Sequence, residues 1–176
     1  MITLNYNSIE KRDLYDKDRK RIGKTIKKGD EIPEGSYILV VLVFIQNSEG
    51  KFLIQKRSEA KNGKYATTGG HPVSGKTSKE GVIQEVKEEL GLEMEPDKVK
   101  WYYGGRLDDE RVFWDDFYYK VDNIDLASLK LQKEEVESVC WLSTDEIIEL
   151  KEKDEFFLNH FEEFEVLIDK LKKEKK

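Results

Sequence analysis

The stretch from Gly69 to Leu92 reads GGHPVSGKTSKEGVIQEVKEELGL and carries three glutamates, Glu85, Glu88 and Glu89, close together. On a helix, residues three and four positions apart lie on the same face, so the three carboxylates are expected side by side. Like charges at this spacing repel one another. Such a face is therefore either a solvated acidic surface or a binding site for a cation.

The boundaries of this helix follow from the residues around it. Thr77 and Ser78 are candidate N-caps, the helix is expected to run to about Leu90, and Gly91 is placed to end it. Before it, Gly69-Gly70 predicts a turn in which backbone can approach a ligand closely. Carboxylate oxygens suit hard cations such as Mg²⁺ and Mn²⁺, which favours a cation site over a solvated face.

These residues resemble the signature of the Nudix family, which reads Gly, five residues, Glu, seven residues, then Arg-Glu-aliphatic-x-Glu-Glu-x-Gly-aliphatic. Gly70 matches the opening glycine, and QEVKEELGL, from Gln84 to Leu92, matches the ending except at its first position. The segments LYDKDRKRIGKTI, LIQKRS and EEVESVCWLSTDEI are similar to the branch that resembles isopentenyl diphosphate isomerase. The resemblance spans roughly residues 10–150.

The resemblance implies a mixed β-sheet sandwiched between helices and an enzyme that hydrolyses a nucleoside diphosphate linked to another moiety, or a similar diphosphate. It implies that Glu85, Glu88 and Glu89 hold Mg²⁺ or Mn²⁺, with the Gly69 carbonyl as a further ligand. Glu85 and Glu88 are the catalytic candidates, and either the metal or Glu85 would activate the attacking water. A metal there would neutralise diphosphate oxygens and lower the pKa of its bound water.

Two positions depart from the signature. Lys76 stands where the family has its first glutamate, and Gln84 stands where it has arginine. Lys76 would bring a competing cation to the edge of the site, and Gln84 would offer Glu85 a neutral hydrogen bond at most. A second hypothesis is therefore a Nudix-like module that binds a nucleotide without cleaving it. Isomerase activity is a weaker alternative, because Gly69 occupies the position of the isomerases' catalytic cysteine.

Other residues have both a functional and a structural interpretation. Arg57, at the end of a predicted strand, is a candidate bidentate donor to a substrate phosphate or an exposed structural arginine. His71, where the isomerases also carry histidine, is a metal or phosphate ligand or a turn residue. Glu134 or Glu135 could add a fourth carboxylate, although a charged loop is favoured. The aromatic residues of the later strands are expected to pack rather than to stack on a base.

Composition limits the class of protein. The chain has 176 residues with a net charge of −6, which argues against a nucleic-acid partner. Cys140 is the sole cysteine and is expected in the core, so no intramolecular disulfide is expected. The N-terminus is polar and the apolar run Tyr37–Ile45 is too short to span a bilayer, so a cytoplasmic protein without a membrane partner is expected. The oligomeric state is left open, a homodimer included.

The pattern of the whole chain predicts one α/β (α+β) domain over residues 1–176, with an N-terminal hairpin extension in 1–35 and C-terminal helices in 143–176. Ser143 and Glu146 form a candidate capping box. Four residues at helical spacing are expected to pack in the core, namely Phe157, Phe161, Phe164 and Ile168. Strands are expected over residues 37–46, 51–58, 99–106, 112–121 and 136–142, with a loop over residues 59–68.

Overall fold

Strand β3 (Ile38–Gln46) runs through the middle of the main sheet because nearly all its side chains are apolar and buried on both faces. The computed structural model describes residues 10–176, so the first nine residues of the predicted N-terminal extension lie outside it. β3 pairs in parallel with β8 along its whole length and antiparallel with β6. The main sheet has the order β5-β4-β3-β8-β7, with β9 paired to β4.

The strands and helices agree with most of the predicted ranges. The strands are β1 (Lys11–Tyr15), β2 (Arg21–Lys27), β4 (Phe52–Arg57), β5 (Tyr65–Ala66), β6 (Thr68–Gly70), β7 (Lys100–Leu107), β8 (Val112–Lys120) and β9 (Val136–Leu142). The helices are α1 (Ser78–Leu90), α2 (Thr144–Glu152) and α3 (Leu158–Glu174). The predicted loop over residues 59–68 is wrong in part, because β5 and the start of β6 form there by pairing with β4 and β3.

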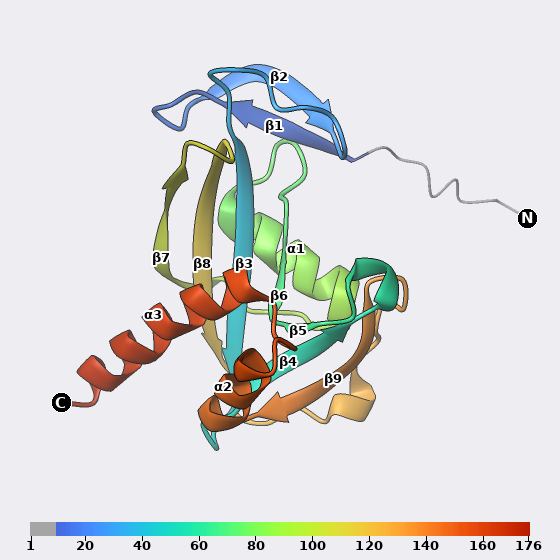
Figure 1. The fold of residues 1–176 in the computed structure, drawn as a ribbon, viewed down its shortest axis with the longest axis vertical. Helices are drawn as coiled ribbons and strands as arrows, with labels where there is room; N and C mark the ends of the chain where they lie inside the picture. The colour runs from blue at the N-terminus through green and yellow to red at the C-terminus, as the bar shows by residue number, and fades with distance from the viewer. Residues whose placement is uncertain (1–9) are drawn as a thin grey trace, which may run out of the picture.

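Two apolar clusters pack on the two faces of the sheet, and they make the predicted sandwich. Helix α1 packs on one face, where Val82, Val86 and Leu90 are fully or almost fully buried. Helices α2 and α3 cover the other face, with Phe161 and Phe164 buried in the cluster (Figure 1). The predicted aromatic stripe on α3 is confirmed at these positions. The capping box of Ser143 and Glu146 at the start of α2 is also confirmed.

Strands β3 and β4 are joined by one ladder pair, Gln46 with Phe52, and then diverge. β6 continues the sheet on the β3 side of this opening, and β5 and β9 continue it on the β4 side. The opening leaves room for a cavity between the two halves of the sheet. It is the feature of the fold that positions the site.

The hairpin β1–β2 lies across one end of the main sheet (Figure 1). Leu14 and Ile26 of the hairpin pack on Ile38 at the start of β3. Tyr15 and Tyr37 exchange backbone hydrogen bonds of 2.9 Å each, which join β1 to the segment before β3. Among residues 10–176, no helix is long and apolar enough to cross a membrane.

Candidate active site

Helix α1 presents the three glutamates to a cavity of about 940 Å³. The helix begins where the Thr77 hydroxyl accepts a hydrogen bond of 3.1 Å from the Glu80 backbone N–H, and the Glu80 carboxylate accepts one from Thr77 in return. It ends at Gly91, which has the left-handed φ of 67°. Both predicted boundaries are confirmed. Because the apolar face of α1 is buried against the sheet, its glutamate face turns to the cavity.

Gly69 and Gly70 lie in strand β6 rather than in a turn, which corrects the prediction. Gly69 pairs with Leu42 and Gly70 with Val41 on the central strand. A Cβ at Gly70 would lie 2.6 Å from Cδ of Glu85, a distance that two carbon atoms do not tolerate. The glycine therefore makes room for the Glu85 carboxyl. The close approach that was expected for a ligand is made by the protein's own side chain.

Two of the three carboxyls are buried in a way that opposes their ionisation. Burial raises the pKa of Glu85 to about 8, and the charges of Glu89 and Glu88 add to this effect. Burial likewise raises the pKa of Glu89 to about 8, with the charge of Glu135 as the next cause. Oε2 of Glu89 is buried without a hydrogen-bond partner. Within residues 10–176, none of the three glutamates takes part in an ion pair.

The donor set fits a hard divalent cation in its chemistry. The glutamates offer carboxylate oxygens, and one of these, on Glu89, is buried without a hydrogen-bond partner. The raised pKa values of Glu85 and Glu89 mean that a bound cation would stabilise their ionised forms. The carboxylate oxygens of the three glutamates do not converge on one point. Among the described residues, no three His, Cys, Asp or Glu side chains converge as a preformed metal site.

The cavity lining also contains basic side chains. Arg12, Lys28, Arg57 and Lys61 all line the cavity. The Lys61 ammonium beside Lys28 lowers the pKa of Lys28, and Lys61 pairs with Glu135 at 3.3 Å. Four cationic side chains in one cavity, two of them lysines in contact, form an environment suited to a multiply charged anion.

Two predicted substrate-binding residues lie in this cavity. The Arg57 guanidinium carbon lies 5.1 Å from the centre of the Phe157 ring, so the side chain is held in place by stacking. His71 lines the cavity, and burial, followed by the charge of Arg12, lowers its pKa to about 4. The imidazole is therefore neutral at pH 7. The Phe157 ring thus packs against the Arg57 guanidinium. The prediction that Phe157 packs in the core is wrong, because it lies outside the apolar clusters.

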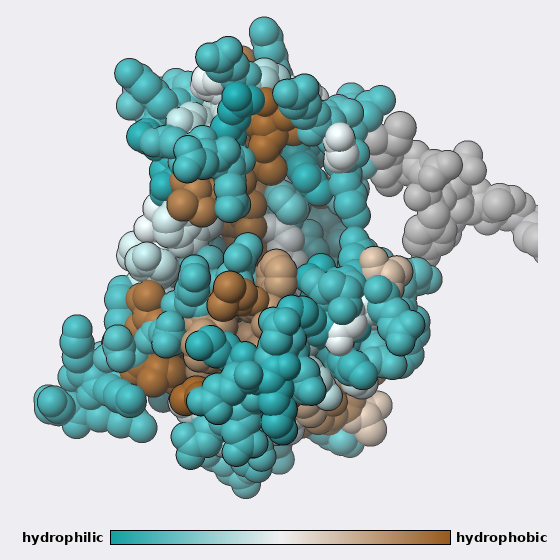
Figure 2. Space-filling view, in the orientation of Figure 1, coloured by the Kyte–Doolittle hydropathy of each residue, from teal (hydrophilic) through white to brown (hydrophobic). Residues whose placement is uncertain are grey.

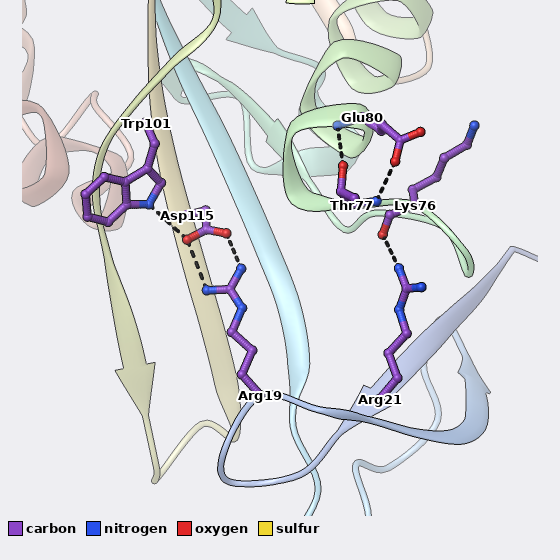
Figure 3. A network of polar contacts seen from close by, with 7 residues as sticks. All are labelled: Arg19, Arg21, Lys76, Thr77, Glu80, Trp101 and Asp115. Carbon is purple, nitrogen blue, oxygen red and sulfur yellow. Dashed lines mark hydrogen bonds and ion pairs between the residues drawn. The ribbon is translucent and has the colours of Figure 1, made fainter.

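The hairpin is fastened to the segment that leads into α1. The Asp13 carboxylate accepts hydrogen bonds from the Ser74 hydroxyl at 2.6 Å and from the Gly75 backbone N–H at 2.9 Å, and it pairs with Arg21 at 3.2 Å. Arg21 also donates to the backbone carbonyl of Lys76 at 2.8 Å (Figure 3). This attachment brings the neighbouring Arg12 to the cavity.

A second clamp joins the tip of the hairpin to strand β8. Arg19 donates both terminal nitrogens to the Asp115 carboxylate, which also accepts a hydrogen bond of 3.0 Å from Nε1 of Trp101 (Figure 3). Burial opposes ionisation of Asp115, but these hydrogen bonds hold its pKa below the usual value. The hairpin is thus held at two places, one on each side of α1's N-terminus.

The sequence profile of the NUDIX domain matches residues 36–163 of this chain. The chain belongs to the Nudix family. An uncharacterised Nudix hydrolase of Listeria monocytogenes is 31% identical over 159 residues, which cover 86% of this chain and 92% of that protein. The family and the enzyme class that were expected from the sequence are confirmed, since Nudix hydrolases act on pyrophosphate bonds.

Solved Nudix structures show the same fold. The MutT protein of Methanosarcina mazei is 29% identical and has a TM-score of 0.61, with 82% of this chain and 99% of that chain covered. A protein of Deinococcus radiodurans is 22% identical with a TM-score of 0.64, and covers 84% of this chain and 91% of its own. The second likeness shows the fold alone.

The two residues that depart from the Nudix signature, Lys76 and Gln84, make other contacts than those predicted. Lys76 is exposed and its side chain points to solvent outside the cavity lining, so it brings no cation to the site (Figure 3). Gln84 donates its amide to Glu88, with Nε2 2.8 Å from Oε1, and not to Glu85. The neutral hydrogen bond was predicted, but its acceptor was wrong.

Several residues of the Nudix cavity were not singled out from the sequence. Arg12, Lys28 and Lys61 are exposed or half-buried cations in a chain rich in lysine, so their spacing carries no signal. Glu135, a candidate fourth carboxylate, lines the cavity. Cys140 is half-buried in β9 outside the lining, and its thiol contacts the Ile54 carbonyl at 3.7 Å.

Proposed function

We propose that this Nudix protein is a divalent-metal-dependent pyrophosphohydrolase that cleaves a nucleoside diphosphate linked to another moiety, or a similar diphosphate. The observation that carries the proposal is one cavity lined both by the α1 glutamates and by a group of basic side chains. A cation bound to a diphosphate carries both kinds of partner, since the carboxylates suit the cation and the basic groups suit the phosphate oxygens.

The metal ligands in this proposal are Glu85, Glu88 and Glu89, with the Gly69 carbonyl as a further ligand. Mg²⁺ or Mn²⁺ held there supplies charge neutralisation and Lewis-acid polarisation of a phosphoryl oxygen. The buried Glu89 oxygen without a hydrogen-bond partner supports this role, because a buried acceptor left unpaired is unfavourable.

The remaining steps fall to side chains of the cavity. Arg57, Lys28 and Lys61 bind and orient the diphosphate, and the neutral His71 imidazole can donate one hydrogen bond to it. Glu85, in its ionised form, accepts a proton from the attacking water as a new O–P bond forms and the bridging P–O bond breaks. The leaving phosphate takes the electron pair, and the basic side chains stabilise its added charge.

The proposal extends to the setting of the protein. In the described part of the chain, the two-stranded hairpin packs on the start of β3 in the seven-stranded sheet, which supports a single domain with the hairpin as an extension. A lone cysteine fits a reducing compartment, so we place the enzyme in the cytoplasm. Isomerase activity is not proposed, because Gly69 has no thiol and Cys140 lies outside the cavity lining.

The test is a screen of nucleoside diphosphates, diphosphate-linked sugars and dinucleoside polyphosphates with Mg²⁺ and with Mn²⁺, with products followed by phosphorus NMR. We expect a monophosphate product and a loss of at least about 100-fold in Glu88→Gln and Glu89→Gln, the scale seen when a group that stabilises the transition state is removed. Glu93→Gln is the matched control, since Glu93 is exposed and pairs with Lys87 at 3.1 Å. Binding of nucleotides without turnover would favour the module that does not cleave its ligand.

A further inference from the structure

A second group of polar side chains lies in the cavity apart from the α1 glutamates. Asp116 of β8 is 1% exposed, and its Oδ2 is buried without a hydrogen-bond partner. Glu163 of α3 has a buried Oε2 without a partner, and Nε1 of Trp114 and Nδ1 of His160 are in the same condition. All four residues line the cavity. The Glu163 carboxyl and the Trp114 indole N–H both lie within hydrogen-bonding reach of Asp116, so these three residues form one cluster. Buried polar atoms are normally paired, so the atoms of this cluster that have no well-formed partner indicate room for a ligand.

The two carboxyls are placed firmly by the fold. Tyr102 of β7 donates its hydroxyl to the Glu163 backbone carbonyl at 3.0 Å, which ties α3 to the sheet at this residue. Burial raises the pKa of Asp116, and the adjacent Glu163 carboxyl adds to this. Burial also raises the pKa of Glu163. N–H donors from a ligand would offset the cost of burying this pair.

The register of the sheet sets the position of this group relative to Gly69. Asp116 pairs with Leu42 on β3, and Leu42 pairs with Gly69 on β6. Asp116 and Gly69 are thus in one cross-strand row, two strand spacings or about 10 Å apart. A ligand whose phosphates bind beside Gly69 and the α1 glutamates can extend along this row to Asp116.

The floor and wall of this end of the cavity suit a flat ring. Val40 and Leu42 of β3 lie in the same rows as Trp114 and Asp116 and line the cavity. The Trp114 indole lies against Gly105, where a Cβ would be 2.6 Å from the ring, and its centre is 5.7 Å from that of Tyr103. Figure 2 shows apolar side chains gathered in a hollow between the hairpin β1–β2 and helix α3.

We propose that Trp114, Asp116 and Glu163 form the subsite for the base of the substrate, and that it selects guanine. This rests on the proposed function, because it assumes a nucleotide whose diphosphate lies at α1. The Watson–Crick edge of guanine carries two adjacent N–H donors beside the O6 acceptor. The carboxyl oxygens accept from the two donors, and the Trp114 indole N–H can donate to O6. Hypoxanthine lacks one of the donors, and uracil offers a single N–H between two carbonyl oxygens.

The experiment compares binding of GDP, IDP and UDP by calorimetry in EDTA, where no turnover is needed. IDP differs from GDP by the 2-amino group alone, so the GDP/IDP ratio reports that contact. We expect GDP to bind at least about 10-fold more tightly than IDP or UDP, the discrimination of one well-made pair of hydrogen bonds. Glu163→Gln and Asp116→Asn are expected to remove most of the ratio, while Glu165→Gln, an exposed position on the same helix, keeps it.

Trp114→Phe, which keeps an aromatic wall but removes the indole N–H, is expected to weaken GDP and IDP equally, since both carry O6. If Asp116→Asn does not fold, Glu163→Gln and Trp114→Phe still decide the matter. Equal affinities for the three nucleotides, or a GDP/IDP ratio that Glu163→Gln leaves unchanged, would overturn the proposal. Loss of Mn²⁺ binding in Glu163→Gln would assign a cation to the carboxyl pair instead and would also overturn it. Hydrolysis without base selectivity contradicts this inference alone, and selectivity without hydrolysis contradicts the proposed function alone.

Discussion

Gln84 holds Glu88 through a hydrogen bond of 2.8 Å between its amide nitrogen and the Glu88 carboxylate, one helical turn further along α1. The other amide atom, Oε1 of Gln84, is buried without a partner. A neutral donor thus stands where the Nudix signature has arginine, and it serves Glu88 while Glu85 is accommodated by Gly70. The consequence is that Glu88, the exposed member of the three, is oriented by Gln84.

Replacing Gln84 by leucine should weaken metal binding, because the Glu88 carboxylate loses its orienting donor. A hydrogen bond to a charged group contributes about 1.5 kcal/mol, so we expect a fall in Mn²⁺ affinity of several-fold to about 10-fold. Electron paramagnetic resonance of free Mn²⁺ measures it. Lys87→Ala on the exposed side of the same helix is the control. An affinity equal to wild type in a folded Gln84→Leu protein would mean that Glu88 does not need this donor.

The stability of the metal-free protein should fall as pH rises. Glu85 and Glu89 have a pKa of about 8 when folded against the usual 4.5, so the folded chain binds more protons than the unfolded chain between these values. Their favourable contribution is complete below about pH 4.5 and is lost as pH rises through about 8. We expect the free energy of unfolding in EDTA, from urea titrations, to drop by about 1 kcal/mol or more over this range.

Glu89→Gln should flatten this pH dependence, because an amide does not titrate, and saturating Mg²⁺ should reverse it in the wild type by stabilising the ionised carboxyls. Glu93→Gln should leave the profile as it is. A wild-type profile that rises from pH 5 to pH 8 in EDTA would show that other groups dominate.

The hairpin should matter for substrate binding through its attachment to the segment before α1. Asp13→Ala removes three contacts, to Ser74, Gly75 and Arg21, and should loosen the strand that brings Arg12 to the cavity. We expect KM to rise several-fold with a smaller change in kcat, and proteolysis within residues 10–30 to become faster. Lys24→Ala, at an exposed position of β2, is the control for changes in the hairpin itself. Unchanged KM and proteolysis in Asp13→Ala would refute the role of this clamp.

Two nearby lysines, Lys61 and Lys64, should differ in their effect on substrate binding. Lys61 lines the cavity, whereas Lys64 pairs with Asp154 at 3.0 Å outside it. Lys61→Ala should raise KM for a diphosphate substrate by about 10-fold, since a charge-assisted hydrogen bond to phosphate is lost. Lys64→Ala should leave KM within about twofold, as expected for an exposed ion pair. Equal effects of the two changes would point to general electrostatics rather than to a contact at Lys61.

The sequence predicted those parts of the fold that depend on local patterns. The boundaries of α1 follow from the chemistry of Thr77 and Gly91, and β3 follows from an apolar run with no polar break. The strands β5 and β6 were missed because they are two and three residues long and form by pairing with distant strands. The sequence predicts a turn at Gly69 and Gly70, since nothing local distinguishes a turn from a close contact with Glu85.

The sequence predicts the part of the site that lies on helix α1. It does not predict which residues of other strands and helices join that part. The spacing of Glu85, Glu88 and Glu89 decided their common face, but the acceptor chosen by Gln84 depends on a rotamer. Asp116 and Glu163 come together from β8 and α3, and no periodicity links them. The pair of aspartates in the middle of an apolar strand, Asp115 and Asp116, is the signal in the sequence that points to this position.

The most direct test of the account measures how a divalent cation changes the affinity for a diphosphate that cannot be cleaved. Calorimetry with the α,β-methylene analogue of a nucleoside diphosphate, in EDTA and in Mg²⁺, gives the coupling between the two ligands. We expect at least about 10-fold tighter binding with Mg²⁺, lost in Glu89→Gln and kept in Glu93→Gln. Lys61→Ala should weaken the analogue in both conditions. An analogue that binds equally well with and without Mg²⁺ would contradict a site in which the α1 glutamates and the basic residues act on one metal-bound diphosphate.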